Sequence, residues 1–242
     1  MKGIILAGGT GSRLLPLTKV TNKHLLPVGT IPMIEHCVNK LVDVNIKDIM
    51  VITGTEHAGD MITHLGSGSD FGCNFTYRVQ DQADGIAAAL LLCEDFVGKD
   101  SCIVLLGDNI FSEDLMHAIE KFESIDSDLP VCLLCLKEVD DPTRFGVPKF
   151  DKKNNTIIKI FEKPVNPPSK FCITGIYLYD KNVFEYIRKL KKSDRGEYEI
   201  TDVNNLYIDL GNVFPYSMEG WWTDAGTHES YSRANDFFKI NK

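Results

Sequence analysis

The feature that most constrains this chain is a glycine-rich loop directly after its first apolar run. Residues 1–6 predict a short strand, which leads straight into Ala7-Gly8-Gly9-Thr10-Gly11-Ser12-Arg13. Because glycine lacks a side chain and readily takes positive φ, such a loop lets backbone N–H groups converge on phosphate oxygens. Arg13 adds a planar, permanently charged fork suited to bidentate phosphate contact. The segment predicts a triphosphate site, although a turn without any ligand also accounts for the glycines alone.

The two most familiar glycine motifs do not fit this loop. A dinucleotide-binding fingerprint needs a third glycine where Leu14 stands, and the sequence contains no G-x-x-x-x-G-K-[ST] run. The loop therefore belongs to a third kind, and a nicotinamide-dependent oxidoreductase is disfavoured.

Composition limits the class of protein. At 242 residues and 43% hydrophobic, the chain can bury one sizeable core, and we expect one domain over residues 1–242. A net charge of −8 offers no basic field for a nucleic acid backbone. No apolar run is long enough to span a bilayer, and Met1-Lys2 leads into a strand without a signal peptide. We therefore expect a cytoplasmic protein without nucleic-acid or membrane partners.

Seven cysteines lie mostly in apolar runs, where reduced thiols behave as small hydrophobic side chains. Cys132 and Cys135 form a C-x-x-C pair, but they fall in a predicted strand, where residues three apart point to opposite faces. The cysteines are interpreted as core residues rather than redox or zinc groups.

Strand-like and helix-like runs alternate through the first half of the chain. The strands are expected at 4–6, 49–53, 75–79, 102–106 and 131–136, and the helices at 33–44, 86–96 and 114–124. This order predicts an α/β fold with a Rossmann-like mixed, mainly parallel sheet and helices on both faces. Ligands of such sheets gather at the carboxyl ends of strands, where the glycine loop, Thr53-Gly54 and residues 106–109 all fall.

The second half of the chain has a different pattern of predicted elements. Two strands at 146–150 and 157–162 are expected to pair around a turn at 151–155, with a proline-rich extended loop at 165–169. A further core strand is expected at 173–179. Helices are expected at 183–190, 200–210 and 231–240. We expect this half to cover the cleft.

Candidate residues for phosphate chemistry occur in several of these segments. Transfer without an enzyme nucleophile needs cations on the phosphate oxygens, a metal held by carboxylates and an anionic incoming group. Asp108 and Asp224 could hold one Mg²⁺, which prefers hard oxygen ligands, although a turn or cap role suits each aspartate alone. Lys23 and Lys163 could each neutralise a phosphate, and Glu162 could accept hydrogen bonds from sugar hydroxyls.

Several motifs together resemble the sugar-1-phosphate nucleotidylyltransferases, and in particular their glucose-1-phosphate thymidylyltransferase branch, in its short form. The resemblance rests on these segments: residues 6–14, 16–18, 25–28, 32–34, 80–85, 106–109, 144–147, 162–164, 174–177, 195–204 and 224–227. It covers nearly the whole chain. It implies that residues 1–140 form a nucleotide-binding part and residues 141–242 a sugar-binding and closing part.

The resemblance also implies roles for individual residues. The nucleotide is expected to contact Leu6, Ala7, Gly8, Gly9, Gly11, Ser12, Arg13, Lys23, Gln80, Gly85 and Asp108. The sugar phosphate is expected to contact Asn109, Gly146, Glu162, Lys163, Ile173 and Thr174. Arg13, Lys23, Asp108 and Lys163 would be catalytic, and Asp108 and Asp224 would bind Mg²⁺.

The implied reaction is thymidylyl transfer from dTTP to α-D-glucose 1-phosphate, which yields dTDP-glucose and pyrophosphate and serves sugar nucleotide biosynthesis. Two alternatives stay open: a UTP-dependent hexose-1-phosphate uridylyltransferase and a catalytically silent sugar-nucleotide sensor. Members of the family commonly form homo-oligomers.

Four positions depart from the pattern common in the family: His24, Ala88, Phe145 and Ala225. His24 could donate to a phosphate or a base edge, or it could be a neutral structural histidine. Phe145 lacks a hydroxyl for the sugar. The chain also stops before the additional C-terminal helices that help form a regulatory site in longer members, so feedback inhibition by a sugar nucleotide is not carried over from the resemblance and stays open.

Overall fold

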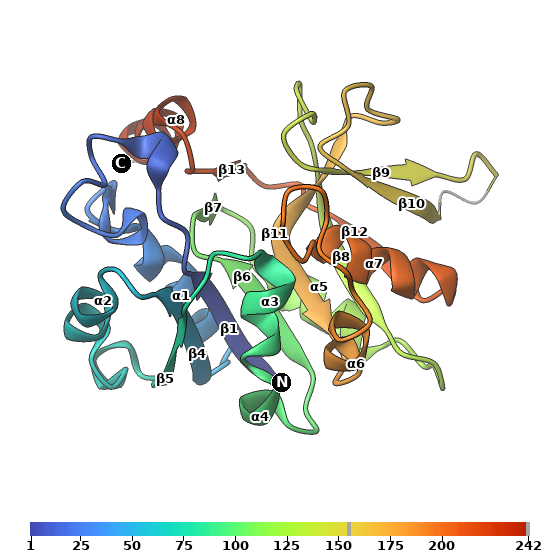
Figure 1. The fold of residues 1–242 in the computed structure, drawn as a ribbon, viewed down its shortest axis with the longest axis horizontal. Coiled ribbons are helices and arrows are strands. Elements are labelled where there is room, and N and C mark those ends of the chain that lie inside the picture. The colour runs from blue at the N-terminus through green and yellow to red at the C-terminus, as the bar shows by residue number, and fades with distance from the viewer. Residues whose placement is uncertain (154–155, 241–242) are drawn as a thin grey trace. The chain divides into compact units, whose positions relative to one another are not determined.

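A computed structural model describes residues 1–153 and 156–240 (Figure 1). Seven strands form one sheet in the order β12-β8-β11-β6-β1-β4-β5. The β1–β4, β4–β5 and β12–β8 pairs are parallel, whereas β11 and β8 are antiparallel. This confirms the predicted mixed, mainly parallel α/β fold.

The chain divides into two compact units, each built from more than one segment. Unit 1 contains residues 1–83, 104–114 and 220–242, and unit 2 contains residues 84–103 and 115–219. The predicted division into residues 1–140 and 141–242 stays a prediction. Residues 241 and 242 lie outside the described part.

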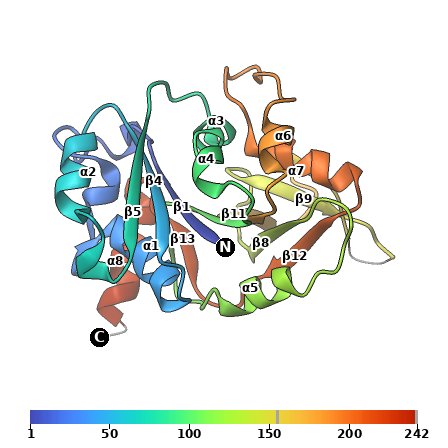
Figure 2. The same cartoon turned by 90° about the horizontal axis from the view of Figure 1, so that it is seen from below.

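Unit 1 is built on three adjacent parallel strands, β1 (Lys2–Ala7), β4 (Asp48–Gly54) and β5 (Asn74–Gln80), which Figure 2 shows side by side. The interiors of β1 and β4 are apolar and buried because one residue after another is Ile, Leu, Val or Met. Strand β5, at the edge of the sheet, is polar at several positions and has no fully buried residue. The remaining elements of this unit are η1 (Ser12–Leu14), η2 (Lys23–Leu25), β2 (Pro27–Val28), β3 (Ile31–Pro32), α1 (Met33–Asp43), α2 (Ala58–Leu65), η3 (Ser69–Phe71), β7 (Asn109–Phe111), β13 (Trp222–Asp224) and α8 (His228–Ile240).

Two features of unit 1 position the candidate site. Helix α1 contacts β1, and its residues Met33, Cys37 and Leu41 share one face at four-residue spacing and are fully buried. Strand β13 pairs antiparallel with β7, and Asp224 lies opposite Asn109 in the register. A segment from the end of the sequence is thereby hydrogen-bonded beside residues 109–111.

Unit 2 is built on β8 (Cys132–Glu138), β11 (Phe171–Tyr179) and β12 (Val213–Ser217), with the hairpin of β9 (Gly146–Phe150) and β10 (Ile157–Glu162). Helix α7 (Ile200–Asp209) contacts both β10 and β12. The other helices of this unit are α3 (Ile86–Leu91), α4 (Glu94–Val97), α5 (Met116–Glu123) and α6 (Val183–Ile187). Strand β6 (Cys102–Leu106) contains the point at which the two units divide.

Most predicted elements are present with small shifts at their ends. The helix expected at 86–96 is instead two short helices, α3 and α4, because the chain turns at residues 92 and 93. The hairpin expected around residues 151–155 is present as β9 and β10, although residues 154 and 155 lie outside the described part. All seven cysteines are free and buried, as predicted.

Among residues 1–153 and 156–240, no helix is both long and apolar enough to cross a membrane. The same residues contain no cluster of three or more His, Cys, Asp or Glu side chains that could hold a metal ion. The predicted pair of Asp108 and Asp224 has one side chain fewer than the smallest such cluster.

Candidate active site

Three strand ends of unit 1 meet at the glycine loop. The sequence predicts the loop and Thr53-Gly54 at this edge, and the third end is Gln80, which only the resemblance placed near the nucleotide. A Cβ on Gly54, at the end of β4, would lie 3.1 Å from the Gly8 carbonyl oxygen, and a Cβ on Gly8 would lie 3.0 Å from Gln80 Oε1. A side chain at Gly54 would therefore press on the Gly8 backbone, whereas one at Gly8 would meet the movable end of the Gln80 side chain. Leu6 and Ala7 are buried within β1, so these two predicted nucleotide contacts offer the loop no side chain.

The loop turns at Gly11, whose φ of 66° favours glycine. A Cβ there would lie 2.8 Å from Thr18 Cγ2 and 3.0 Å from Lys23 Cβ. The Thr18 hydroxyl donates to the Gly11 carbonyl over 2.8 Å and holds the turn. The loop is thereby pressed against the segment that carries Lys23, while Ser12 and Arg13 follow in η1 and are exposed.

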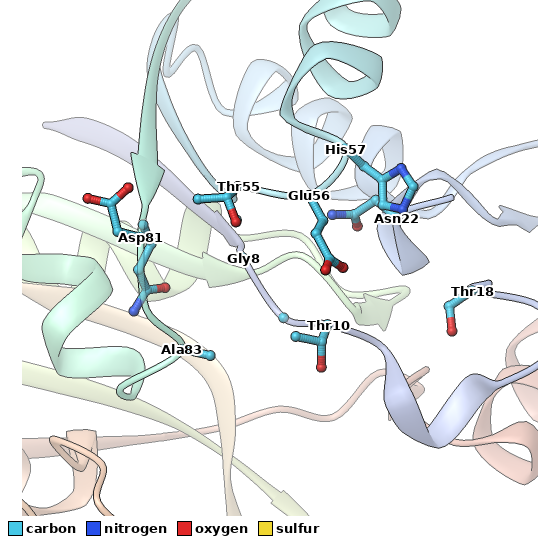
Figure 3. A pocket seen from close by; sticks show the side chains of 12 residues that line it. Gly8, Thr10, Thr18, Asn22, Thr55, Glu56, His57, Asp81 and Ala83 are labelled. Carbon is cyan, nitrogen blue, oxygen red and sulfur yellow. The ribbon is translucent and has the colours of Figure 1, made fainter. Parts of the chain in front are cut away.

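A pocket of about 570 Å³, counting the part open to solvent, lies beside this loop (Figure 3). The predicted residues Gly8, Gly9 and Gln80 line it. Figure 3 shows the Glu56 carboxylate pointing into the space between Gly8, Thr10 and Asn22. The sequence analysis missed the pocket-lining residues Thr10, Thr18, Asn22, Thr55, Glu56, His57, Asp81 and Ala83. The position of residues 55–57 immediately after a predicted strand was the signal that could have found three of them.

Lys23 and Asp108 form a shielded ion pair. Lys23 Nζ lies 2.5 Å from Asp108 Oδ2, and the exposed fractions of the two side chains are 11% and 14%. Asn109 Nδ2 donates to the other Asp108 oxygen over 3.1 Å. Burial by itself raises the pKa of Asp108, but the Lys23 charge and the hydrogen bonds from Lys23 and Asn109 hold that pKa well below its ordinary value. Asp108 is therefore ionised throughout the physiological pH range.

Asp108, Asp224 and Arg13 converge on Gly226. A Cβ on Gly226 would lie 3.4 Å from Asp108 Oδ2, 3.4 Å from Asp224 Oδ2 and 3.2 Å from Arg13 Nη2. The β7–β13 pairing and the hydrogen bond from Ala225 N to Asp108 O, 2.7 Å long, bring these distant residues together. Two carboxylate oxygens that face one point are a donor set suited to Mg²⁺. Within the described ranges, Arg13 has no carboxylate within ion-pair distance.

His24 has a structural position. It is 2% exposed, its Nδ1 lies 2.7 Å from Asn22 Oδ1, and its ring leaves no room for a Cβ on Gly107. Burial, followed by the neighbouring Lys23 charge, lowers the pKa of His24 to about 3. His24 is therefore neutral and does not line the pocket, which supports the structural alternative over donation to a phosphate.

This pKa predicts a pH-dependent stability. Between the ordinary histidine value of 6.5 and about 3, the unfolded state binds a proton at His24 that the folded state excludes. The free energy of unfolding should therefore fall as pH drops from 6.5 towards 3, and the drop should be smaller in His24→Gln. Urea denaturation of both proteins at pH 7 and pH 4.5 measures this, and parallel losses would contradict the assignment.

In unit 2, the predicted sugar residues gather around Glu162. Glu162 lies opposite Gly146 in the β9–β10 register, and a Cβ on Gly146 would lie 3.1 Å from Thr201 Oγ1 and 3.6 Å from Ile173 Cγ1. Thr201 donates to Glu162 Oε2 over 2.5 Å, and Arg195 Nη2 donates to Oε1 over 3.3 Å. The carboxylate is thus fixed from two sides. The Thr201 and Arg195 contacts were not predicted.

The other predicted sugar-phosphate residues differ in what their side chains offer. Lys163 has a φ of 43°, an unusual value for a residue with a side chain. Its Nζ lies 3.6 Å from Glu162 Oε1, and the side chain is about half exposed, at 46%. The Thr174 hydroxyl is buried and donates to the Cys135 carbonyl over 2.9 Å. In unit 1, Asn109 is buried, and its Oδ1 accepts from Trp222 Nε1 over 2.8 Å. Asn109 therefore orients Asp108 through its other amide atom.

Gly85 begins α3 in unit 2 with a φ of 109°, and a Cβ there would lie 2.5 Å from the Tyr198 carbonyl oxygen. We expect Gly85→Ala to lower the free energy of unfolding by about 2 kcal/mol or more, because backbone strain and a backbone clash add together. Gly98→Ala is the matched control, since Gly98 also has positive φ but no atom within 4 Å of its Cβ position. Urea denaturation measures the decrease in the free energy of unfolding in both variants. Equal decreases would contradict the clash with Tyr198.

Residues 2–240 match the family model described as nucleotidyl transferase. The chain belongs to the nucleotidyl transferase family. A glucose-1-phosphate thymidylyltransferase of Neisseria meningitidis is 40% identical over 240 residues, which cover 98% of this chain and 82% of that protein. A Xanthomonas campestris protein of the same name is 41% identical over 242 residues, which cover 98% of this chain and 80% of its own.

Solved structures of the nucleotidyl transferase family agree with the fold. A candidate glucose-1-phosphate thymidylyltransferase from Bacillus anthracis, solved with sucrose, is 58% identical with a TM-score of 0.93 over 99% of this chain and 95% of that one. A UDP-glucose pyrophosphorylase complexed with UDP-glucose has a TM-score of 0.86 over 100% of this chain and 99% of that one, at 23% identity. The second likeness concerns the fold alone.

Proposed function

We propose that this protein transfers a thymidylyl group from dTTP to α-D-glucose 1-phosphate and so produces dTDP-glucose and pyrophosphate. The observation that carries the proposal is the convergence of Asp108, Asp224 and Arg13 on Gly226 beside a glycine loop. The names of the relatives from Neisseria and Xanthomonas support the choice of dTTP and glucose 1-phosphate.

The chemistry needs no side chain as nucleophile. A hexose 1-phosphate oxygen is already anionic at neutral pH, so it forms a new bond to the α-phosphorus of the nucleotide while the bond to the pyrophosphate oxygen breaks. Pyrophosphate leaves with the electron pair of that bond, and no proton has to be moved. The protein therefore contributes positioning and charge neutralisation.

Residues of unit 1 would hold the triphosphate. The backbone of residues 8–11 would donate to phosphate oxygens, and the exposed Arg13 fork would bind them bidentately. Lys23 has three N–H donors, so its bond to Asp108 leaves donors for the α-phosphate. Asp108 and Asp224 would hold Mg²⁺, which neutralises phosphate charge when bound. The convergent oxygens of these two carboxylates are the reason that the metal fits.

Residues of unit 2 would hold the sugar phosphate. Glu162 is fixed by Thr201 and Arg195, so it would accept hydrogen bonds from hexose hydroxyls in a set orientation. Lys163 would bind the hexose phosphate, and its partly exposed side chain is available for that contact. Thr174 would contribute through its backbone, because its hydroxyl already donates to Cys135.

The test of this function is pyrophosphate release across a panel of nucleotides and sugar phosphates with Mg²⁺. We expect release with dTTP and glucose 1-phosphate, and dTDP-glucose as the second product. UTP differs from dTTP by one methyl and one hydroxyl, and a methyl changes selectivity by only about 1–3 kcal/mol, so UTP should also be used. Absence of release with every pair would favour the sugar-nucleotide sensor.

We further propose that the protein works in the cytoplasm. Its seven free, buried cysteines suit a reducing compartment. A homo-oligomeric state remains a prediction from the resemblance, and size-exclusion chromatography with light scattering would measure it.

A further inference from the structure

The charges around the pocket of unit 1 are divided by sign. Glu56 and Asp81 line the pocket, and no lysine or arginine of the described residues does so. The cations lie beyond it: Lys23 Nζ is 3.5 Å from the position of a Cβ on Gly9, and Arg13 faces Gly226. A triphosphate is drawn towards the cations and repelled by the carboxylates. The side of the pocket that carries Glu56 and Asp81 therefore suits the uncharged part of a nucleotide.

The order of contacts along the glycine loop indicates how a bound nucleotide is oriented. Gly8 lies against Gln80, whereas Gly9 and Gly11 lie against Lys23. In a nucleotide the sugar lies between the base and the phosphates. With the base at Gln80 and the phosphates at Lys23, the sugar falls between these two ends, beside Gly8 and Gly9. Figure 3 shows Glu56 pointing into the space between Gly8, Thr10 and Asn22, all of which line the same pocket.

Glu56 has the chemistry for this contact. Its carboxylate is exposed and has no hydrogen-bond or ion-pair partner among residues 1–153 and 156–240. His57 beside it is already engaged, with Nδ1 lying 3.0 Å from Asp60 Oδ2. An ionised carboxylate only accepts hydrogen bonds, so it selects an O–H or N–H donor and not a phosphate.

We propose that Glu56 is a specificity-determining residue that binds the 3′-hydroxyl of the incoming nucleotide. The inference rests on the proposed function, because dTTP carries only one free sugar hydroxyl, at the 3′ position. When a nucleotide without that hydroxyl fills the pocket, the Glu56 carboxylate receives no hydrogen bond from it. A nucleotide without the hydroxyl is therefore bound more weakly.

The test compares dTTP with 2′,3′-dideoxythymidine triphosphate, which differs only at this position. The wild-type protein should prefer dTTP by about ten- to a hundredfold in kcat/KM, the range expected for a hydrogen bond to a charged group. In Glu56→Ala the ratio should fall to about one, because dTTP loses the contact and the dideoxy nucleotide has none to lose. Glu56→Gln keeps an acceptor oxygen and should retain part of the preference.

Asp81→Ala is the matched control, since Asp81 is the other carboxylate of the pocket and follows Gln80 at the base end. It should keep the wild-type ratio. The proposal would be overturned if Asp81→Ala lost the preference for dTTP over the dideoxy nucleotide while Glu56→Ala kept it. Equal kcat/KM for the two nucleotides in the wild-type protein would also overturn it. Circular dichroism of each variant checks that it is folded.

Calorimetric titration with the same two nucleotides separates this proposal from the proposed function. A protein that releases no pyrophosphate yet binds dTTP more tightly than the dideoxy nucleotide, and loses the difference in Glu56→Ala, would refute the transferase and keep the sugar contact. Turnover with dTTP, together with an unchanged preference for dTTP over the dideoxy nucleotide in Glu56→Ala, would keep the transferase and refute the sugar contact. Binding of neither nucleotide would refute both.

Discussion

Asp108→Asn lowers kcat/KM by about a hundredfold or more, which is the cost of losing one preorganised electrostatic group. Asparagine has nearly the same shape as aspartate but no charge, so the side chain occupies the same space while the attraction for a cation is lost. The Lys23 ammonium, 2.5 Å away, also loses its counter-charge. The measurement is pyrophosphate release at several Mg²⁺ concentrations.

Asp224→Asn is the companion variant for this prediction. Both carboxylates face Gly226, so both single variants should need more Mg²⁺ for half-maximal activity. Because the two groups would hold the same ion, the double variant should lose less than the product of the single losses. Wild-type kcat/KM in Asp108→Asn at every Mg²⁺ concentration would refute the metal site.

Arg13→Ala should lower kcat/KM by about 10²–10³ with no change in thermal stability. Arg13 is exposed, and within the described residues it has no ion-pair partner, so the folded protein loses no ion pair with it. Its guanidinium is instead available to phosphate oxygens beside Gly226. Steady-state kinetics with varied dTTP and a thermal melt of the same sample make the comparison.

Arg13→Lys distinguishes charge from geometry. Lysine keeps the charge but loses the planar fork that makes two parallel hydrogen bonds, so it should restore only part of the activity. A melting temperature that falls together with activity in Arg13→Ala would contradict the assignment, because it would make Arg13 a structural residue.

The strands and their ends could be predicted because both are marked by short local segments of the sequence. Apolar runs such as residues 49–53 define strands by themselves, and the glycines that follow β1 and β4 mark strand ends. Parallel strands then bring their carboxyl ends to one edge, so the meeting of Gly8, Gly54 and Gln80 follows from the order of elements. Helix α2 could not be recognised because only Met61 and Leu65 are buried in it.

The candidate site was only partly predictable because several contacts are non-local. The sequence and the resemblance indicate Asp108 and Asp224 as candidates, but the pairing of β7 with β13 depends on the tertiary fold. The same applies to the burial of His24 and to the use of the Thr174 hydroxyl within unit 2. Glu56 carries no sequence signal of its own, because an exposed glutamate after a strand is common.

Strand β13 also constrains when the protein can become active during its synthesis. The ribosome releases Arg13, Lys23 and Asp108 long before Asp224, so a nascent chain holds one carboxylate of the pair without the other. Residues 220–240 complete unit 1, and their arrival supplies the second carboxylate and the strand that aligns it. Truncated translation products should therefore lack the acidic pair, which would keep incomplete chains from consuming nucleotide.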